Sequence, residues 1–176
     1  MLTKAMRKYK IKVKSYFVAT DYTCSPGVSE SKLDCYFIPH ESLKPEFMRH
    51  GFKEEQLEAT GIPVSGKFVT DKTKAESKRA LSLPENKRVI ILMCGSMGCG
   101  PMKLIARTLT EVIKENEYLV VICGSNRKLY KSLSVHEREG SVRVVGYTRN
   151  MPDYMNSAEL ILTKPGGLST TEAAAN

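Results

Sequence analysis

The sequence predicts an α/β protein whose second half is a parallel sheet covered by helices on both faces. Two observations support this class. Short, continuously apolar segments recur after residue 88, and an amphipathic or polar segment separates each of them from the next. Apolar runs without alternation are typical of strands buried on both faces, and strands that alternate with helices form parallel sheets. Ligands of such sheets bind beyond the carboxyl ends of the strands.

Four strands are expected in this half, with helices between them. Their positions are 89–94, 119–123, 142–145 and 160–163. The helix after the first strand is expected over 102–116, because Pro101 suits the start of a helix. A short helix precedes the last strand, and another helix, which carries Glu172, follows it.

The first half predicts a smaller sheet. Residues 11–21 and 33–38 have the apolar and aromatic content of strands, and residues 42–50 place apolar side chains on one helical face before Gly51. Residues 65–88 are polar and rich in lysine. We therefore expect one domain over residues 1–64, a connector with a surface helix over 65–88, and a second domain over 89–176.

Composition indicates a globular cytoplasmic protein. The chain has 176 residues, of which 41% are hydrophobic, so it can bury a core. No apolar run approaches the roughly 20 residues that span a bilayer, and the N-terminus lacks the apolar stretch of a secretory signal. The five cysteines show no C-x-x-C spacing and the three histidines are scattered, so we expect reduced thiols and no metal site.

The net charge of +8 is concentrated at the N-terminus, where six basic side chains fall within the first fourteen residues without an acidic one. A solvated surface is the favoured interpretation, and an anionic membrane surface or a phosphorylated ligand remains open. Nucleic acid is the weakest alternative, because the chain has no Trp, only 7% aromatic residues and no nucleic-acid motif. We expect no nucleic-acid partner.

The loop after the first strand of the second half is rich in glycine, with Gly95, Ser96, Met97 and Gly98 at its start. Glycines let backbone N–H groups approach a ligand, and a helix N-terminus attracts anions such as a diphosphate. The spacing matches neither G-x-G-x-x-G nor the P-loop, so neither a nicotinamide cofactor nor ATP is indicated. A tight strand-to-helix turn without a ligand is an equally good interpretation.

The last loop repeats the arrangement and raises two alternatives for Glu172. Ser169 and Glu172 have the spacing of a capping box, in which each side chain bonds the backbone of the other. Alternatively, the Glu172 carboxylate accepts hydrogen bonds from both hydroxyls of a ribose. One carboxylate cannot fully do both.

A third loop, residues 146–152, also follows a strand. Its backbone around Thr148 could pair with the edge of a nucleobase, or Thr148 or Asn150 could simply cap the next helix before Pro152. All three loops belong to one parallel sheet and are expected to face one crevice, which favours a ligand site.

These motifs together resemble one family. Gly95-Ser96-Met97-Gly98, the segment 144–151 and the segment 163–173 resemble the monogalactosyldiacylglycerol synthase and processive diacylglycerol glucosyltransferase family, which is glycosyltransferase family 28. The segments 20–26, 34–39 and 60–64 look like the end of that family's acceptor domain and its interdomain linker. In order and combination the match covers nearly the whole chain.

The resemblance implies a glycosyltransferase-B architecture, with the end of an acceptor domain followed by most of a nucleotide-sugar domain. It implies transfer of a hexose from UDP-glucose or UDP-galactose to diacylglycerol or another membrane lipid, with inversion, at the inner face of the cell membrane and without cofactor or metal. Gly95, Ser96, Met97 and Gly98 would hold the diphosphate, and Thr148 would meet the uracil. The phosphates would also be lined by Gly167, Leu168 and Ser169, and Glu172 would bind the ribose.

Two departures from the family accompany this resemblance. The family's initial glycine-rich loop with its histidine and the segments that follow the glutamate helix have no counterpart, so the chain is expected to be part of a larger enzyme. At Ser65 relatives often have arginine. No catalytic base is assigned, because a loop role suits Asp21 better. A lipid-linked peptidoglycan hexosaminyltransferase and a noncatalytic UDP-sugar-binding protein remain as alternatives.

Overall fold

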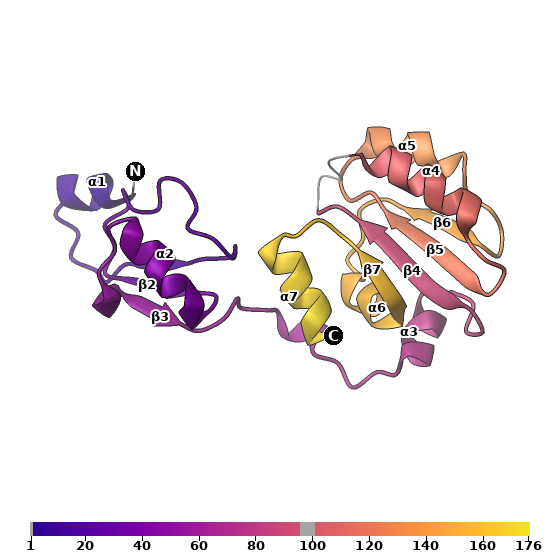
Figure 1. Ribbon diagram of the computed structural model, residues 1–176, viewed down its shortest axis with the longest axis horizontal. Coiled ribbons are helices and arrows are strands. Elements are labelled where there is room, and N and C mark those ends of the chain that lie inside the picture. Colours follow the sequence, from indigo (N-terminus) through magenta and orange to yellow (C-terminus); the bar gives the residue numbers. More distant parts are fainter. Residues whose placement is uncertain (1, 96–100) are drawn as a thin grey trace. The chain divides into compact units, whose positions relative to one another are not determined.

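The chain divides into two compact units, Met1–Val64 and Ser65–Asn176 (Figure 1). The structure, a computed structural model, describes residues 2–95 and 101–176. Both units are α/β, and every pair of named strands in the described residues is parallel. The predicted fold class is confirmed at this level.

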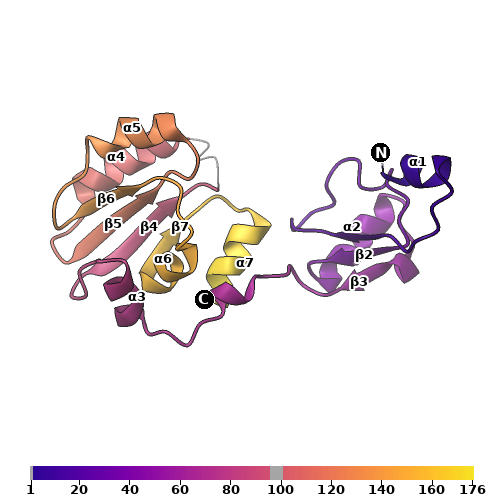
Figure 2. The same cartoon turned by 180° about the vertical axis from the view of Figure 1, so that it is seen from behind.

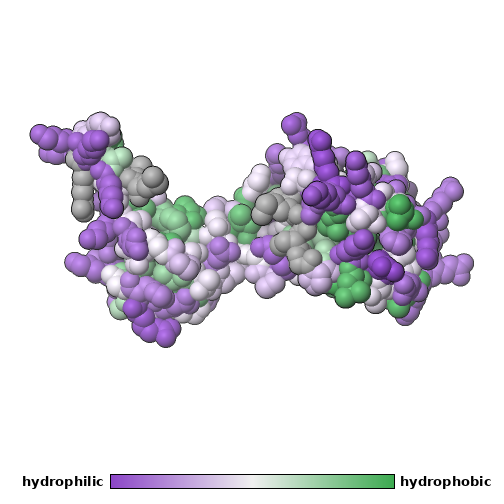
Figure 3. Space-filling view, turned by 90° about the horizontal axis from the view of Figure 1, so that it is seen from above, coloured by the Kyte–Doolittle hydropathy of each residue, from purple (hydrophilic) through white to green (hydrophobic). Residues whose placement is uncertain are grey.

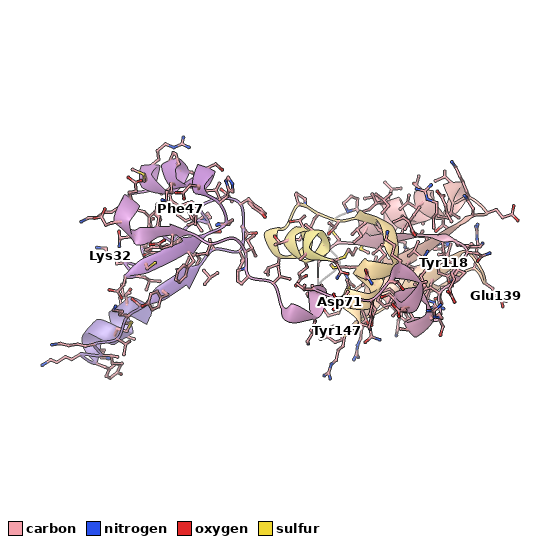
Figure 4. The ribbon with its side chains drawn as sticks, turned by 90° about the horizontal axis from the view of Figure 1, so that it is seen from below. Lys32, Phe47, Asp71, Tyr118, Glu139 and Tyr147 are labelled. Atoms are coloured by element: carbon pink, nitrogen blue, oxygen red, sulfur yellow. The ribbon has the colours of Figure 1, made fainter. Side chains whose placement is uncertain are left out.

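The first unit contains a three-stranded sheet in the order β1-β2-β3. Its strands are β1 (Tyr16–Val18), β2 (Cys35–Ile38) and β3 (Leu57–Ala59). Its helices are α1 (Leu2–Lys8) and α2 (Lys44–Arg49), with short 3-10 turns at Glu41–Leu43 and Glu54–Gln56. Phe47 is fully buried between α2 and the sheet (Figure 4). Phe52 meets the ring of Tyr36 edge-on at a centroid distance of 4.6 Å.

Helix α2 ends as the sequence predicts. Gly51 has a φ of 89°, its N–H donates to Met48 O at 2.9 Å, and the N–H of Phe52 donates to Phe47 O at 3.3 Å. This pair of bonds is a Schellman motif, which needs a residue in the left-handed region at the position of Gly51. The motif turns the chain so that Phe52 returns to the core.

The first strand is shorter than the pattern predicts. We expected a strand over 11–21, but only Tyr16–Val18 pairs, and residues 8–14 are exposed. Within the described residues β1 has a partner on one side only, and that partner, β2, is itself four residues long. Backbone that lacks a neighbouring strand gains no ladder hydrogen bonds, so the alternating segment before Ser15 stays outside the sheet.

The second unit contains a four-stranded parallel sheet in the order β6-β5-β4-β7. The strands are β4 (Arg88–Met93), β5 (Glu117–Ile122), β6 (Val142–Val145) and β7 (Ala158–Leu162). The helices are α3 (Lys74–Ala80), α4 (Met102–Val112), α5 (Arg127–Ser134), α6 (Met151–Ser157) and α7 (Gly167–Ala175), with a 3-10 turn at Gly66–Phe68. α4 and α5 cover one face of the sheet, whereas α3 and α6 lie on the other (Figures 1 and 2).

The core of this unit explains why the two central strands, β4 and β5, are apolar after their first residue. Leu119, Val121 and Val144 pack with Met102 and other residues of α4 and α5 on one face. The strand residues between them are also buried, as Val120 and Ile122 are. A strand covered on both faces has no solvent side for polar residues, which is why the sequence pattern located β4 and β5 closely.

Residues 65–88, expected as a connector, belong to the second unit. Thr73 and Glu76 form a capping box at the start of α3, in which Thr73 Oγ1 accepts from Glu76 N and Glu76 accepts from Thr73 N at 2.7 Å. The opposite side of α3 is buried, with Ser77 fully inaccessible and Lys78 only 5% exposed. The segment therefore carries part of the core of the second unit.

Helix α4 ends earlier than expected, at Val112 rather than residue 116. Ile113 leaves the helix with φ −59° and ψ 131°, and the next residues form a turn in which Glu117 N donates to Lys114 O at 3.0 Å. The Glu117 carboxylate closes the same turn by accepting from Lys114 N at 3.1 Å. None of the helices in the described part of the chain has the length and apolarity needed to cross a membrane.

Candidate functional site

The four strands of the second unit end at one edge of the sheet, and the chain changes direction there. From β4 the chain adds β5 and then β6 on one side, and afterwards places β7 on the other side of β4. The reversal lies between β4 and β7. In open parallel sheets a crevice forms at this point, because the loops of the two strands lead to opposite faces.

The loop after β4 contains Gly95, which has a φ of 68°. This conformation favours glycine, because a side chain in the left-handed region meets the backbone. Ser96, Met97 and Gly98, which were predicted to contact a diphosphate, lie outside the described residues. Pro101 occupies the N-cap position of α4, and the first helical residue is Met102.

The loop after β7 makes a tight turn on Pro165, in which the N–H of Gly166 donates to Lys164 O at 2.8 Å. The side chain of Lys164 lies beside the β4 loop, because a methyl group placed on Gly95 would be 3.3 Å from its Cε atom. The hydroxyl of Thr163, just before this turn, is buried and has no hydrogen-bond partner among the described residues. Two loops predicted to share a site therefore do come together at the reversal point.

Helix α7 begins at Gly167, which corrects the predicted capping box. The N-cap residue is Gly166, and the first helical bond runs from Thr170 N to Gly166 O at 3.1 Å. Ser169 is therefore inside the helix and cannot cap it. A Ser-x-x-Glu spacing fits a capping box, but the two glycines before it let the chain enter the helix earlier. The N–H groups of Gly167, Leu168 and Ser169 belong to the first turn, where no helical carbonyl is available to them.

Glu172 lies in the middle of α7 and is partly buried. Burial raises the pKa of its carboxyl above the ordinary value of 4.5, because desolvation disfavours the charged form. Neither a hydrogen bond nor an ion pair joins the Glu172 carboxylate to another residue within 2–95 and 101–176. Of the two alternatives weighed for this residue, the capping box is wrong, and contact with a ribose stays a prediction.

The loop after β6 holds Thr148 at the same edge of the sheet. Thr148 Oγ1 accepts a hydrogen bond from Asn150 N at 3.1 Å, which closes the loop. Asn150 occupies the N-cap position of α6, but its side chain makes no capping bond. Tyr147 is 71% exposed and extends from this loop (Figure 4). Because β5 lies between β4 and β6, the Thr148 and Gly95 loops are about 10 Å apart, or two strand spacings.

Sequence reasoning missed the loop after β5, which lies between the two loops just described. Gly124 has a φ of 58°, and Asn126 Oδ1 accepts from Leu129 N at 2.9 Å to start α5. On that helix, the ring of Tyr130 would be 3.8 Å from a methyl group placed on Gly146, so α5 borders the β6 loop. The signal was present in the Cys-Gly-Ser-Asn sequence that follows an apolar strand, which has the same pattern as the other loops.

The part of the site that the structure describes shows no metal cluster. The residues described contain no group of three or more His, Cys, Asp or Glu side chains that could hold a metal ion. Cys123 is fully buried at the end of β5, and burial raises the pKa of its thiol to about 11, so it stays protonated at neutral pH. Among the described residues, this edge offers backbone N–H groups, the ammonium of Lys164, the hydroxyls of Thr163 and Ser169 and the carboxylate of Glu172.

Two family models match the chain. That of monogalactosyldiacylglycerol (MGDG) synthase matches residues 2–64, and that of the glycosyltransferase family 28 C-terminal domain matches residues 89–176. The first match ends where the first structural unit ends. The second covers half of the chain and contains all four strands of the second sheet apart from the first residue of β4.

Relatives of known name match most of the chain. A processive diacylglycerol beta-glucosyltransferase of Staphylococcus saprophyticus is 33% identical over 159 residues, which are 89% of this chain and 40% of the relative. The enzyme of that name in Staphylococcus aureus strain Newman is 28% identical over 171 residues, which are 96% of this chain and 43% of the relative. The chain thus spans about two fifths of the length of these relatives.

Solved structures share the fold at low sequence identity. The Anabaena protein HepE in complex with UDP and glucose is 13% identical with a TM-score of 0.61, over 99% of this chain and 54% of its own. The UDP co-structure of MnaA from S. aureus is 15% identical with a TM-score of 0.62, over 93% of this chain and 49% of its own. WaaG, a glycosyltransferase involved in lipopolysaccharide biosynthesis, is 11% identical with a TM-score of 0.61, over 99% of this chain and 60% of its own.

Proposed function

The chain belongs to glycosyltransferase family 28, and on this premise we propose that it takes part in glycolipid synthesis by transferring a hexose from a UDP-sugar to diacylglycerol, with inversion. Its α/β fold is of the glycosyltransferase-B type, as predicted. The names of the staphylococcal relatives support diacylglycerol as the acceptor and glucose as the sugar. UDP in two of the similar structures supports the same nucleotide here.

The observation that carries this proposal is the meeting of the β4 and β7 loops at the reversal point of the second sheet. Gly95 and Lys164 approach each other there, and the free N–H groups of the first turn of α7 lie in the adjoining segment. Backbone N–H groups at a helix start favour an anion through both hydrogen bonding and the helix dipole. A diphosphate at this edge would use Gly95 with Ser96, Met97 and Gly98 on one side.

On the other side the diphosphate would meet the start of α7, at Gly167, Leu168 and Ser169. Among the described residues the hydroxyl of Ser169 has no partner, whereas the hydroxyls of Thr170 and Thr171 bond back to Gly167 O at 3.1 and 2.7 Å. Ser169 is therefore the hydroxyl of this turn that can donate to a phosphate oxygen. The hydroxyls of the two threonines instead donate to a carbonyl group of their own helix.

The nucleoside would extend from the diphosphate toward the β6 loop. Glu172 would accept hydrogen bonds from the ribose hydroxyls, and the backbone around Thr148 would pair with the uracil. A partly buried carboxylate without a partner among the described residues costs stability, and a ribose would supply the hydrogen bonds that it lacks. During transfer the leaving UDP gains negative charge, and the N–H groups at this edge would stabilise that charge.

A membrane surface would present the lipid acceptor to the enzyme. Lys8, Lys10, Lys12 and Lys14 of the first unit are all exposed, and Figure 3 shows hydrophilic side chains projecting from this unit. Each basic side chain near an anionic bilayer contributes about 1 kcal/mol of attraction. Cosedimentation with vesicles should therefore require anionic lipid and weaken with added salt. Binding that depends neither on the lipid charge nor on the salt concentration would contradict this part of the proposal.

The central experiment measures binding and turnover on the same chain. Titration calorimetry with UDP is expected to show one site, and ADP should bind more weakly because the base contacts differ. Transfer is assayed with UDP-glucose and UDP-galactose on vesicles that contain diacylglycerol, with the glycolipid product detected directly. UDP binding without product would contradict transfer by this chain and support a noncatalytic nucleotide-sugar protein. Absence of both would contradict the whole proposal.

A further inference from the structure

The side chain of Lys164 lies against glycines of two different loops. A methyl group placed on Gly166 would be 3.0 Å from its Nζ atom and 3.4 Å from its Cε atom, and one placed on Gly95 would be 3.3 Å from the same Cε. The tight turn on Pro165 folds the lysine chain back over Gly166. Its amino group is therefore held at the junction of the β4 and β7 loops.

The two glycines leave the space that this lysine chain occupies. A carbon atom at 3.0 to 3.4 Å is closer than ordinary van der Waals contact, so any larger residue at either position would push Lys164 aside. Gly95 also has a left-handed φ, which already favours glycine there. At Gly166 the φ is −98°, so the backbone conformation does not require glycine, and the end of the Lys164 side chain is what an added methyl group would meet.

The charge of this lysine is not neutralised by the described part of the chain. Lys164 is exposed and takes part in none of the ion pairs within residues 2–95 and 101–176. By contrast, Lys72 and Lys78 of the same unit are both paired with carboxylates. An unpaired ammonium beside unbonded backbone N–H groups attracts an anion more strongly than either feature alone.

We propose that Lys164 is the cationic contact of the UDP-sugar diphosphate and stabilises UDP as it leaves. This inference rests on the proposed function and adds a residue to it. In the transfer, the bond between the anomeric carbon and the β-phosphate oxygen breaks, and its electron pair stays on that oxygen. The acceptor oxygen bonds to the anomeric carbon and its proton passes to a base. The UDP product thus carries one more negative charge than the bound donor had, which an adjacent ammonium stabilises.

The test compares ligands that differ only in their phosphates. Calorimetry measures the affinity of the full chain and of Lys164→Met for UDP, UMP and uridine. Losing a charged hydrogen bond should weaken UDP binding about ten- to a hundredfold, leave uridine within about twofold, and weaken UMP by an intermediate amount. Lys164→Arg keeps the charge and should recover part of the UDP affinity, whereas Lys164→Gln should behave as the Met variant does.

Lys131→Met is the matched control, because it removes one exposed positive charge from α5 of the same unit. It should leave the affinity for all three ligands unchanged. Equal UDP affinity in the wild type and Lys164→Met would overturn the role of Lys164 while leaving the proposed function intact. A parallel loss of uridine binding would also overturn it, since it would show a disturbed loop. If the wild type does not bind UDP, the proposed function itself is wrong.

Discussion

The carboxylate of Glu159 joins the segment before the second sheet to the sheet itself through an ion pair with Lys78. Lys78 Nζ lies 3.1 Å from Glu159 Oε1 and also donates to Lys87 O at 2.7 Å. Glu159 is the extra residue of a bulge in β7, because Val89 is opposite Ala158 and Ile90 is opposite Leu160. The bulge lets its second oxygen accept from Val89 N at 2.5 Å.

This pair predicts a specific loss of stability. The side chains of Lys78 and Glu159 are 6% and 26% exposed, so removing the lysine leaves a carboxylate that water reaches only in part. Lys78→Met should lower the free energy of unfolding by about 2 kcal/mol, somewhat below the cost for a fully buried pair. Urea unfolding followed by circular dichroism measures the change.

The control is Arg79→Met, in the same helix. Arg79 pairs with Glu85 at 2.8 Å, but both side chains are about half exposed, so the change should cost less than about 0.5 kcal/mol. Adding Glu159→Gln to Lys78→Met should recover part of the loss, since no unpaired charge then remains. If Lys78→Met and Arg79→Met lowered the free energy of unfolding equally, the Lys78 pair would contribute no more to stability than the exposed Arg79 pair.

Glu172→Gln should raise stability while lowering affinity. Because burial raises the pKa of Glu172 in the folded state, that state binds the proton more tightly than the unfolded chain does. Ionisation therefore costs stability above the raised pKa, and the cost disappears as the pH falls through that pKa toward 4.5. Gln is never ionised, so the variant should melt at a higher temperature at pH 7 and match the wild type near pH 4.

The same change should weaken UDP binding about tenfold or more at pH 7, because a neutral amide accepts a ribose hydroxyl less strongly than a carboxylate does. Thermal unfolding between pH 4 and 8, together with calorimetry, measures both effects. Glu111→Gln, at an exposed position of α4, is the control and should change neither. A lower melting temperature of Glu172→Gln at pH 7 would indicate a structural partner for the carboxylate, contrary to the proposed role.

The backbone of the second unit was largely predictable from its sequence, and the reason is burial. The strands predicted at 89–94 and 119–123 are apolar because helices cover both faces of the sheet there, and the glycines at 95 and 124 mark their ends. The segment before β1 shows where the pattern of apolar and polar residues fails to predict a strand. Its alternation of lysine with apolar residues is compatible with a strand, but pairing depends on a neighbour that local sequence does not reveal.

Contacts between distant segments were not predictable. Lys164 reaches Gly95 only because β7 returns to the side of β4, and the bulge at Glu159 depends on the register of the same two strands. The start of α7 was misplaced for a local reason. The Ser-x-x-Glu spacing around Ser169 is shared by capping boxes and by helix interiors, and only the hydrogen bond to Gly166 decides between them.

Gly95→Ala tests the space that Lys164 needs. The change places alanine at a φ of 68°, which costs about 1–2 kcal/mol, and its methyl group would displace the Lys164 side chain. UDP affinity should fall about tenfold. Gly140→Ala is a matched control, since Gly140 has a φ of 74° and nothing within 4 Å of the added methyl group. It should cost similar stability and leave UDP affinity unchanged. Equal affinities of the two variants would contradict a role for the contact.

Fragments that begin at different residues test the boundary between the two units, because only a fragment that contains the whole second unit should fold stably. The buried cluster of α4, α5 and the second sheet contains no residue of the first unit, so residues 65–176 should fold alone and bind UDP within about threefold of the full chain.

A fragment of residues 89–176 would lack α3 and with it the Lys78 partner of Glu159. It would also lose the hydrogen bond from the buried amide of Asn156 to Ser77 Oγ at 2.9 Å. Glu159 would keep only its bond from Val89 N, and the Asn156 amide would lose its bonds to Lys72 O and Ser77 Oγ. These losses should cost at least about 2 kcal/mol, and the exposed face of α6 should promote aggregation. Circular dichroism and calorimetry on both fragments measure the difference. If the shorter fragment were equally stable and bound UDP equally well, residues 65–88 would be a connector outside the folded unit.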